Sequence, residues 1–128
     1  MASLVFMVVS CTPDPPMPEM ERTVQHEFAA FLSVAGTDAN DVWVVGAQPG
    51  LLQEPVVLHW DGTDWDNIST EQQHPMWWVH PFEAGPTFIG GGGATVLKIE
   101  GDTVERTNTP KFFGNTVYGL WGADPEEV

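Results

Sequence analysis

The chain has 128 residues, 42% of them hydrophobic, and its six Trp and seven Phe are enough to build the packed core of one domain. Its 18 acidic and 4 basic residues give a net charge of -14, which argues against nucleic acid and anionic membrane surfaces, because both require Lys and Arg to neutralise phosphates. A charged partner should therefore be cationic. The single cysteine excludes an intramolecular disulfide and a cysteine-based zinc site.

The N-terminus carries a short apolar run, residues 4–9, that leads to the single cysteine, Cys11. This arrangement resembles the lipobox of bacterial lipoproteins, in which a signal peptide is cut just before a cysteine that then carries the lipid. We therefore expect a signal-peptide-like segment over residues 1–11 and a lipid anchor at Cys11. The first basic residue is Arg22, so the usual basic start of a signal peptide is missing. The apolar stretch is also short, which suggests a true start upstream of Met1. The alternative to a lipid anchor is a buried or incidental thiol at Cys11.

Residues 12–27 are rich in proline and acidic side chains and show no apolar periodicity. Such a composition cannot bury enough apolar surface to offset the entropy of ordering, so it predicts an extended linker. The linker would hold the folded part, residues 28–128, away from an anchor.

The segment that follows contains short apolar runs separated by turn residues. Each run is too short for a helix and rich in Val, Ile and Trp, which predicts an antiparallel four-stranded meander with strands at 31–35, 42–46, 56–60 and 65–68. The second run is apolar at every position, so its sheet should be covered on both faces. Between the last two strands, Asp61 and Gly62 predict a tight hairpin in which Gly62 supplies a positive φ.

A second unit with a similar layout follows, and we expect its strands at 76–79, 87–90, 94–99 and 103–107. Residues 97–104 align with 58–65, so Gly101 corresponds to Gly62 and the hairpin should recur. Residues 120–128 then align with 34–42. The start-to-start spacing of this last alignment corresponds to about 43 residues per unit, within the range of propeller blades.

The segments 34–46 and 58–65 resemble the repeat of bacterial β-propeller proteins, often secreted proteins or lipoproteins, whose blades read roughly V-W-G-S-x-x-x-D-V-W-A-V-G … H-W-D-G-x-x-W. The resemblance is close in the first unit and looser in the second, where residues 85–87 replace the Asp-Val-Trp signature. Ala35 also stands where the family has Trp, which is kept at Trp121.

The resemblance implies an all-β fold of antiparallel four-stranded blades: blade 1 at about 28–70, blade 2 at about 76–108 and a partial blade 3 at about 115–128. Two blades and a fragment cannot close a ring of about 4 to 8 blades. We therefore expect a piece of a larger propeller whose uncovered faces meet the remaining blades or favour self-association.

The resemblance implies a location, the bacterial cell envelope or the secreted fraction, but no reaction. We expect a non-catalytic binding or scaffold module, not an enzyme, with a protein or glycan partner and no cofactor. The alternative is a glycan-binding or sialidase-like, glycoside-acting propeller whose catalytic residues lie outside this chain. A sialidase should present clustered arginines for its acidic substrate, whereas this sequence has only Arg22 and Arg106.

Few residues suggest a binding site. Trp77 and Trp78 are adjacent on a predicted strand, so one of them could be exposed and stack on a sugar, although core packing is the favoured interpretation. The four histidines show no metal-ligand spacing, so we expect no metal at His26, His59, His74 or His80. No serine lies in a nucleophile motif. The run of four glycines at 90–93 predicts a flexible turn, because no Gly-Lys-Ser/Thr follows it.

Overall fold

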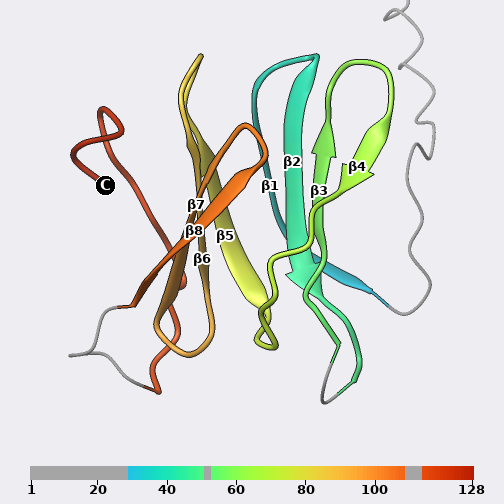
Figure 1. Ribbon diagram of the computed structural model, residues 1–128, viewed down its shortest axis with the longest axis vertical. Coiled ribbons are helices and arrows are strands. Elements are labelled where there is room, and N and C mark those ends of the chain that lie inside the picture. The colour runs from blue at the N-terminus through green and yellow to red at the C-terminus, as the bar shows by residue number, and fades with distance from the viewer. Residues whose placement is uncertain (1–28, 51–52, 109–113) are drawn as a thin grey trace, which may run out of the picture.

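The computed structural model describes residues 29–50, 53–108 and 114–128, and these ranges contain eight β-strands and no helix (Figure 1). The strands form two separate four-stranded sheets, ordered β1-β2-β3-β4 and β5-β6-β7-β8, and every pairing is antiparallel. The first sheet contains β1 (Ala30–Asp38), β2 (Asp41–Ala47), β3 (Val57–Trp60) and β4 (Trp65–Asn67). The second contains β5 (Met76–Pro81), β6 (Thr87–Gly91), β7 (Thr95–Glu100) and β8 (Thr103–Asn108).

The predicted all-β fold and its two antiparallel sheets are confirmed, and all eight predicted strands are present within a few residues. The largest difference is at β1, which continues to Asp38 instead of ending at residue 35. Ala94, predicted to start a strand, lies in the preceding turn with a φ of 54°. Sequence cannot fix such ends, because they depend on which partner strand is still available for hydrogen bonding.

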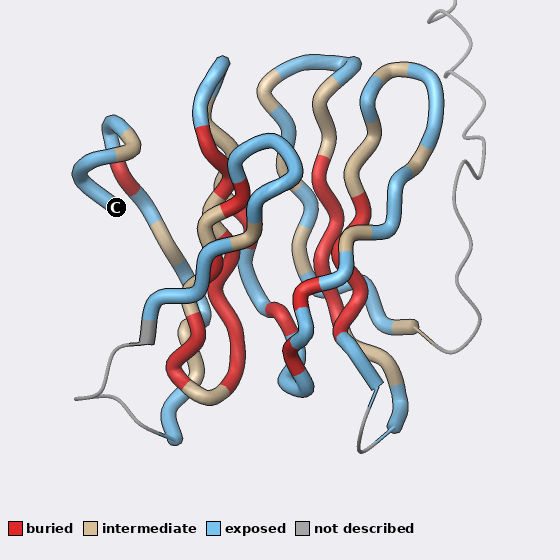
Figure 2. Tube along the Cα trace, in the orientation of Figure 1, coloured by how far each residue is buried: buried red, intermediate tan, exposed pale blue. Residues whose placement is uncertain are grey.

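The two sheets pack face to face around a shared apolar core. β1 and β2 both contact β5, and the buried stretches in Figure 2 lie mainly in the central strands. The first sheet contributes Trp43, Val45 and Val57 to this core, and the second contributes Met76, Val79, Ile89, Leu97 and Ile99. A separate cluster of Val44, Val56 and Leu58 is also buried. Alternate residues of β2 therefore enter different apolar clusters, which confirms that both faces of this strand are covered.

Each sheet has a β-bulge in its first strand. The pairing with the second strand shifts between Phe31 and Ser33 in β1, and between Met76 and Trp78 in β5. Because a bulge inserts one extra residue, it reverses the alternation of faces beyond it. Met76 and Val79 are consequently both buried, although three residues apart on an uninterrupted strand would point to opposite faces.

The two predicted hairpins are present and alike. Trp60 pairs with Trp65 across the first, and Ile99 pairs with Val104 across the second. Gly62 has a φ of 97° and Gly101 a φ of 58°, while the residue after each glycine does not have a positive φ. This pattern is typical of two-residue hairpin turns with Gly at the first central position.

The glycine run is not the open turn that its composition suggests. Of the four glycines, Gly90 and Gly91 lie within β6. Gly92 and Gly93 lie in the turn that follows, together with Ala94. A Cβ on Gly90 would lie 2.7 Å from Val117 Cγ1, and one on Gly93 would lie 2.8 Å from the His74 ring. These glycines therefore allow neighbouring segments to approach closely.

The described C-terminal segment, residues 114–128, packs along the second sheet without forming a strand. The amide of Val117 donates to the carbonyl of Gly91 at 2.9 Å, and the amide of Ala94 donates to the carbonyl of Asn115 at 2.7 Å. The absence of a side chain at Gly90 leaves room for Val117. These contacts place Tyr118 beside the first strand of the second sheet, next to Trp77.

Candidate functional site

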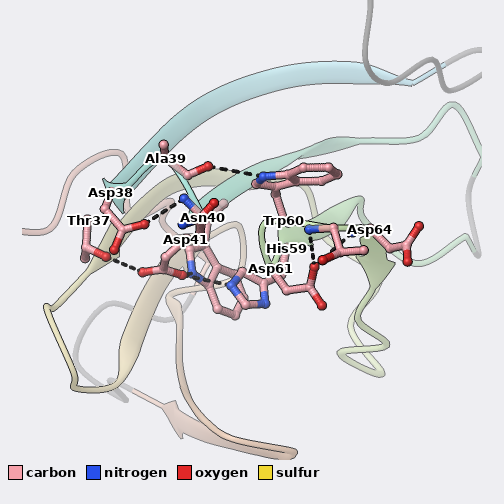
Figure 3. A network of polar contacts seen from close by, with 11 residues as sticks. Thr37, Asp38, Ala39, Asn40, Asp41, His59, Trp60, Asp61 and Asp64 are labelled. Atoms are coloured by element: carbon pink, nitrogen blue, oxygen red, sulfur yellow. Dashed lines mark hydrogen bonds and ion pairs between the residues drawn. The ribbon is translucent and has the colours of Figure 1, made fainter.

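A partly buried hydrogen-bond network centred on Asp41 joins the first three strands at one end of the first sheet (Figure 3). One carboxylate oxygen of Asp41, Oδ1, accepts from Trp43 Nε1 at 2.9 Å and contacts His59 Nε2 at 2.8 Å. The other oxygen accepts from the Thr37 hydroxyl at 2.5 Å. We call Thr37, Asp41, Trp43 and His59 the Asp41 clamp.

Local structure places each member of the clamp. A register shift between Gly36 and Asp38 frees Thr37 from regular pairing, and the turn that follows returns the chain to Asp41. Trp43 pairs directly with His59 across β2 and β3, and their rings stack with centroids 4.2 Å apart and planes 20° apart. Sequence analysis missed this network, although the hydrogen-bonding side chains of Thr37, Asp41 and Trp43 lie close together in the sequence.

The clamp holds Asp41 as a carboxylate. Partial burial raises the pKa of Asp41, but the hydrogen bonds from Thr37, His59 and Trp43 together outweigh burial, so the net pKa is lowered. Protonation of the carboxylate would weaken these hydrogen bonds, because a neutral carboxyl group is a poorer acceptor than an ionised one. The clamp therefore ties β1, β2 and β3 together most strongly above the pH at which Asp41 titrates.

The arrangement differs from a catalytic triad although it contains a hydroxyl, an imidazole and a carboxylate. In a triad the hydroxyl donates to the imidazole, and the imidazole donates to the carboxylate. Here the Thr37 hydroxyl donates to Asp41 itself, so His59 is not placed to take its proton. The geometry indicates a structural role.

A cleft of about 950 Å³ lies between the sheets beside the clamp. In the part of the chain that the structure describes, its lining contains no Lys or Arg but five carboxylate side chains, those of Asp38, Asp41, Asp66, Glu83 and Asp102. This end of the molecule therefore disfavours anionic ligands.

Trp77 and Trp78, the predicted stacking aromatics, are both exposed, by 37% and 40%. Strict alternation predicts opposite faces for them, but the bulge between Met76 and Trp78 removes that alternation. The Tyr118 ring meets the Trp77 ring edge to face, with centroids 5.2 Å apart and planes at 68°. Core packing, the favoured interpretation from sequence, is therefore wrong for both tryptophans.

The other predicted site residues lie in different places. Asp61 does not sit in the centre of its turn but caps it, since its Oδ1 accepts from the amides of Thr63 and Asp64 at 2.7 and 2.9 Å. These two amides, that of Asp64 first, lower the pKa of Asp61. Cys11 and His26 lie outside the described residues. His74 and His80 stand apart from His59, and the residues that the structure describes contain no group of three His, Cys, Asp or Glu able to hold a metal ion.

No helix long and apolar enough to cross a membrane occurs among the described residues. No protein-family model matches this chain, and no significant similarity is found to a curated protein or to a solved structure. The resemblance to bacterial propeller repeats therefore rests on the segments 34–46 and 58–65 alone.

Proposed function

We propose that this chain is a non-catalytic glycan-binding module built from propeller-type blades, and that its ligand contacts the exposed aromatic side chains of the second sheet. The observation that carries the proposal is the joint exposure of Trp77 and Trp78 at a bulge. We call Trp77, Trp78 and Tyr118 the aromatic platform.

Exposure of large aromatic rings is energetically unfavourable, because each ring could bury on the order of 150 to 250 Å² in a core. A platform of three such side chains on a chain of this size marks an interaction surface. Flat aromatic faces suit the apolar C–H faces of sugar rings, and the edge contact from Tyr118 holds the Trp77 ring in place.

The propeller architecture is supported by the arrangement of the sheets. Two four-stranded antiparallel sheets with consecutive strand order, packed face to face, have the geometry of neighbouring blades. The proposed envelope location rests on the lipobox-like sequence around Cys11. Mass spectrometry of the mature N-terminus from a bacterial host tests it, and an unmodified Cys11 still preceded by Ser10 would contradict the anchor.

Calorimetric titration of the purified chain with a panel of soluble neutral and acidic oligosaccharides tests glycan binding. We expect at least one of them to bind, and Trp77→Ala or Trp78→Ala to weaken that binding at least tenfold, equivalent to about 1.4 kcal/mol. Trp121→Ala is the matched control, because Trp121 is 77% exposed but outside the platform. Failure of the whole panel to bind, or equal losses from all three variants, would contradict the proposed function.

A further inference from the structure

A second cavity, of about 610 Å³, opens at the end of the second sheet opposite the acidic cleft. Thr87, at the start of β6, lines the acidic cleft, whereas Gly92 and Gly93, just beyond the end of β6, line this second cavity. Its wall also includes Trp77 of the aromatic platform and Arg106 of β8. We call this cavity the Arg106 pocket.

The Arg106 pocket reverses the charge of the rest of the chain. Among the described residues, its lining contains no Asp or Glu and one basic side chain, Arg106. Among the described residues, the Arg106 guanidinium forms no ion pair, and its hydrogen bond to the Thr95 hydroxyl is long, at 3.4 Å. Lys98, by contrast, pairs with Glu100 at 3.4 Å. A guanidinium that has no carboxylate partner among the described residues is available to bind one from a ligand.

The shape of the pocket also suits a single small ring. Gly92 and Gly93 contribute backbone without side chains, and the His74 ring lies against both of them. The amide of Gly92 donates to the carbonyl of Pro75 at 3.0 Å, which fixes this wall. Trp77 then offers an apolar face on the same pocket that holds the Arg106 guanidinium.

We infer that the Arg106 pocket binds a single sugar residue that carries a carboxylate, such as a uronic acid within an otherwise neutral glycan. Arg106 pairs with the carboxylate, and Trp77 stacks on the C–H face of the ring. The net charge of -14 disfavours strongly polyanionic chains, because repulsion grows with the charge of the ligand. The inference rests on the proposed function, since it takes Trp77 as a glycan contact, and adds the chemistry of the ligand.

The test is an NMR titration of the intact 128-residue chain that follows the Trp indole signals, with methyl β-glucuronide and methyl β-glucoside as probes. These probes differ by one carboxylate. We expect the glucuronide to bind at least tenfold more tightly than the glucoside. Arg106→Gln should abolish this preference, and Arg106→Lys should keep part of it. Lys98→Gln, which removes the paired cation outside this pocket, should leave it unchanged.

The outcomes separate the two proposals. Equal binding of both probes, or a preference that survives Arg106→Gln, overturns the carboxylate inference, while the proposed glycan-binding function stands if Trp77→Ala weakens binding. No detectable binding of either probe also overturns the inference. The proposed function is overturned as well by failure of the whole oligosaccharide panel, or by equal losses from Trp77→Ala, Trp78→Ala and Trp121→Ala. Circular dichroism of each variant checks that the sheets remain folded.

Discussion

The first and second sheets can be compared residue by residue through their strand pairing. In the first sheet Val42 pairs with Gly36 on one side and Trp60 on the other. In the second sheet Thr87 pairs with Pro81 and Ile99 in the same way. The backbones of the two sheets therefore correspond at the end where the acidic cleft lies.

The side chains at the corresponding positions differ in kind. Where the first sheet has Asp41, Trp43 and His59 of the clamp, the second has Pro86, Phe88 and Lys98. Phe82 lies edge to face with both His80 and Phe88, at centroid distances of 4.8 and 6.0 Å. One end of the first sheet is thus held by hydrogen bonds to an ionised group, and the same end of the second by aromatic contacts. Both kinds of contact can stabilise the same backbone arrangement, but only the hydrogen bonds to Asp41 respond to protonation of a carboxylate.

The largest change in stability is expected at the bulge that each sheet has in its first strand. Gly46 and Gly91 pair with the residues that precede the bulges, Phe31 and Met76. A Cβ on Gly46 would overlap the carbonyl oxygen of Ala30, which is backbone, whereas one on Gly91 would meet the Met76 sulfur at 2.6 Å and the Pro75 carbonyl oxygen at 2.8 Å.

We expect Gly46→Ala to lower the free energy of unfolding by about 3 kcal/mol and Gly91→Ala by less, because the Met76 side chain can move. Gly119→Ala is the control, since its Cβ would meet nothing within 4 Å. Urea denaturation measures all three. A larger loss at Gly91 would show that the second bulge is the more tightly packed.

The next effect concerns the clamp. Asp41→Ala leaves Thr37, Trp43 and His59 without their acceptor, so we expect a loss of about 2 kcal/mol in the free energy of unfolding. Lys98→Ala, at the position corresponding to His59, should change it by no more than about 0.5 kcal/mol, since its ion pair is partly exposed. Similar losses from both would contradict the structural role of the clamp.

The hairpins provide a closer comparison. Gly62→Val and Gly101→Val each force a β-branched residue into a positive φ, at a cost of about 1 to 2 kcal/mol. Gly62→Val should lose more stability than Gly101→Val, because a Cβ at position 62 would also meet Asn40 at 2.8 Å. A Cβ at position 101 would meet nothing within 4 Å. Thr63→Val should have a much smaller effect. Thermal melts measure the loss of stability in each variant. Equal losses from Gly62→Val and Thr63→Val would contradict the placement of the strained position at Gly62.

The smallest effect is a pH dependence to which two carboxylates of the first sheet contribute. The pKa values of Asp41 and Asp61 are lowered in the folded chain, so their stabilising contribution is present above the unfolded value of about 4 and is lost as the pH falls through the folded values. We expect the free energy of unfolding to fall on acidification below about pH 4. The Asp41→Ala chain should show a shallower fall than the unmodified chain. An unchanged slope in Asp41→Ala would contradict the lowered pKa.

Much of the fold was predictable because short-range patterns determine it. Short apolar runs with β-branched residues between turn residues predicted eight strands, and the glycine after Asp61 predicted the positive φ of Gly62. The candidate site was less predictable. The sequence predicted that one of Trp77 and Trp78 could be exposed, but the exposure of both follows from a bulge, and a bulge is a property of the pairing between β5 and β6.

By itself, the sequence determined the strands, the hairpin turns and the apolar faces of β2, because these depend on residues within a few positions of one another. The tertiary structure alone decided the contacts between distant residues. It brought His59 to Asp41 across 18 positions, and Arg106 and Trp77 to one pocket. It also explains the glycines at 90–93, because the segments that approach them closely, at His74 and Val117, come from elsewhere in the chain. Alternation within a strand says which side a residue faces, but not which distant segment covers that side.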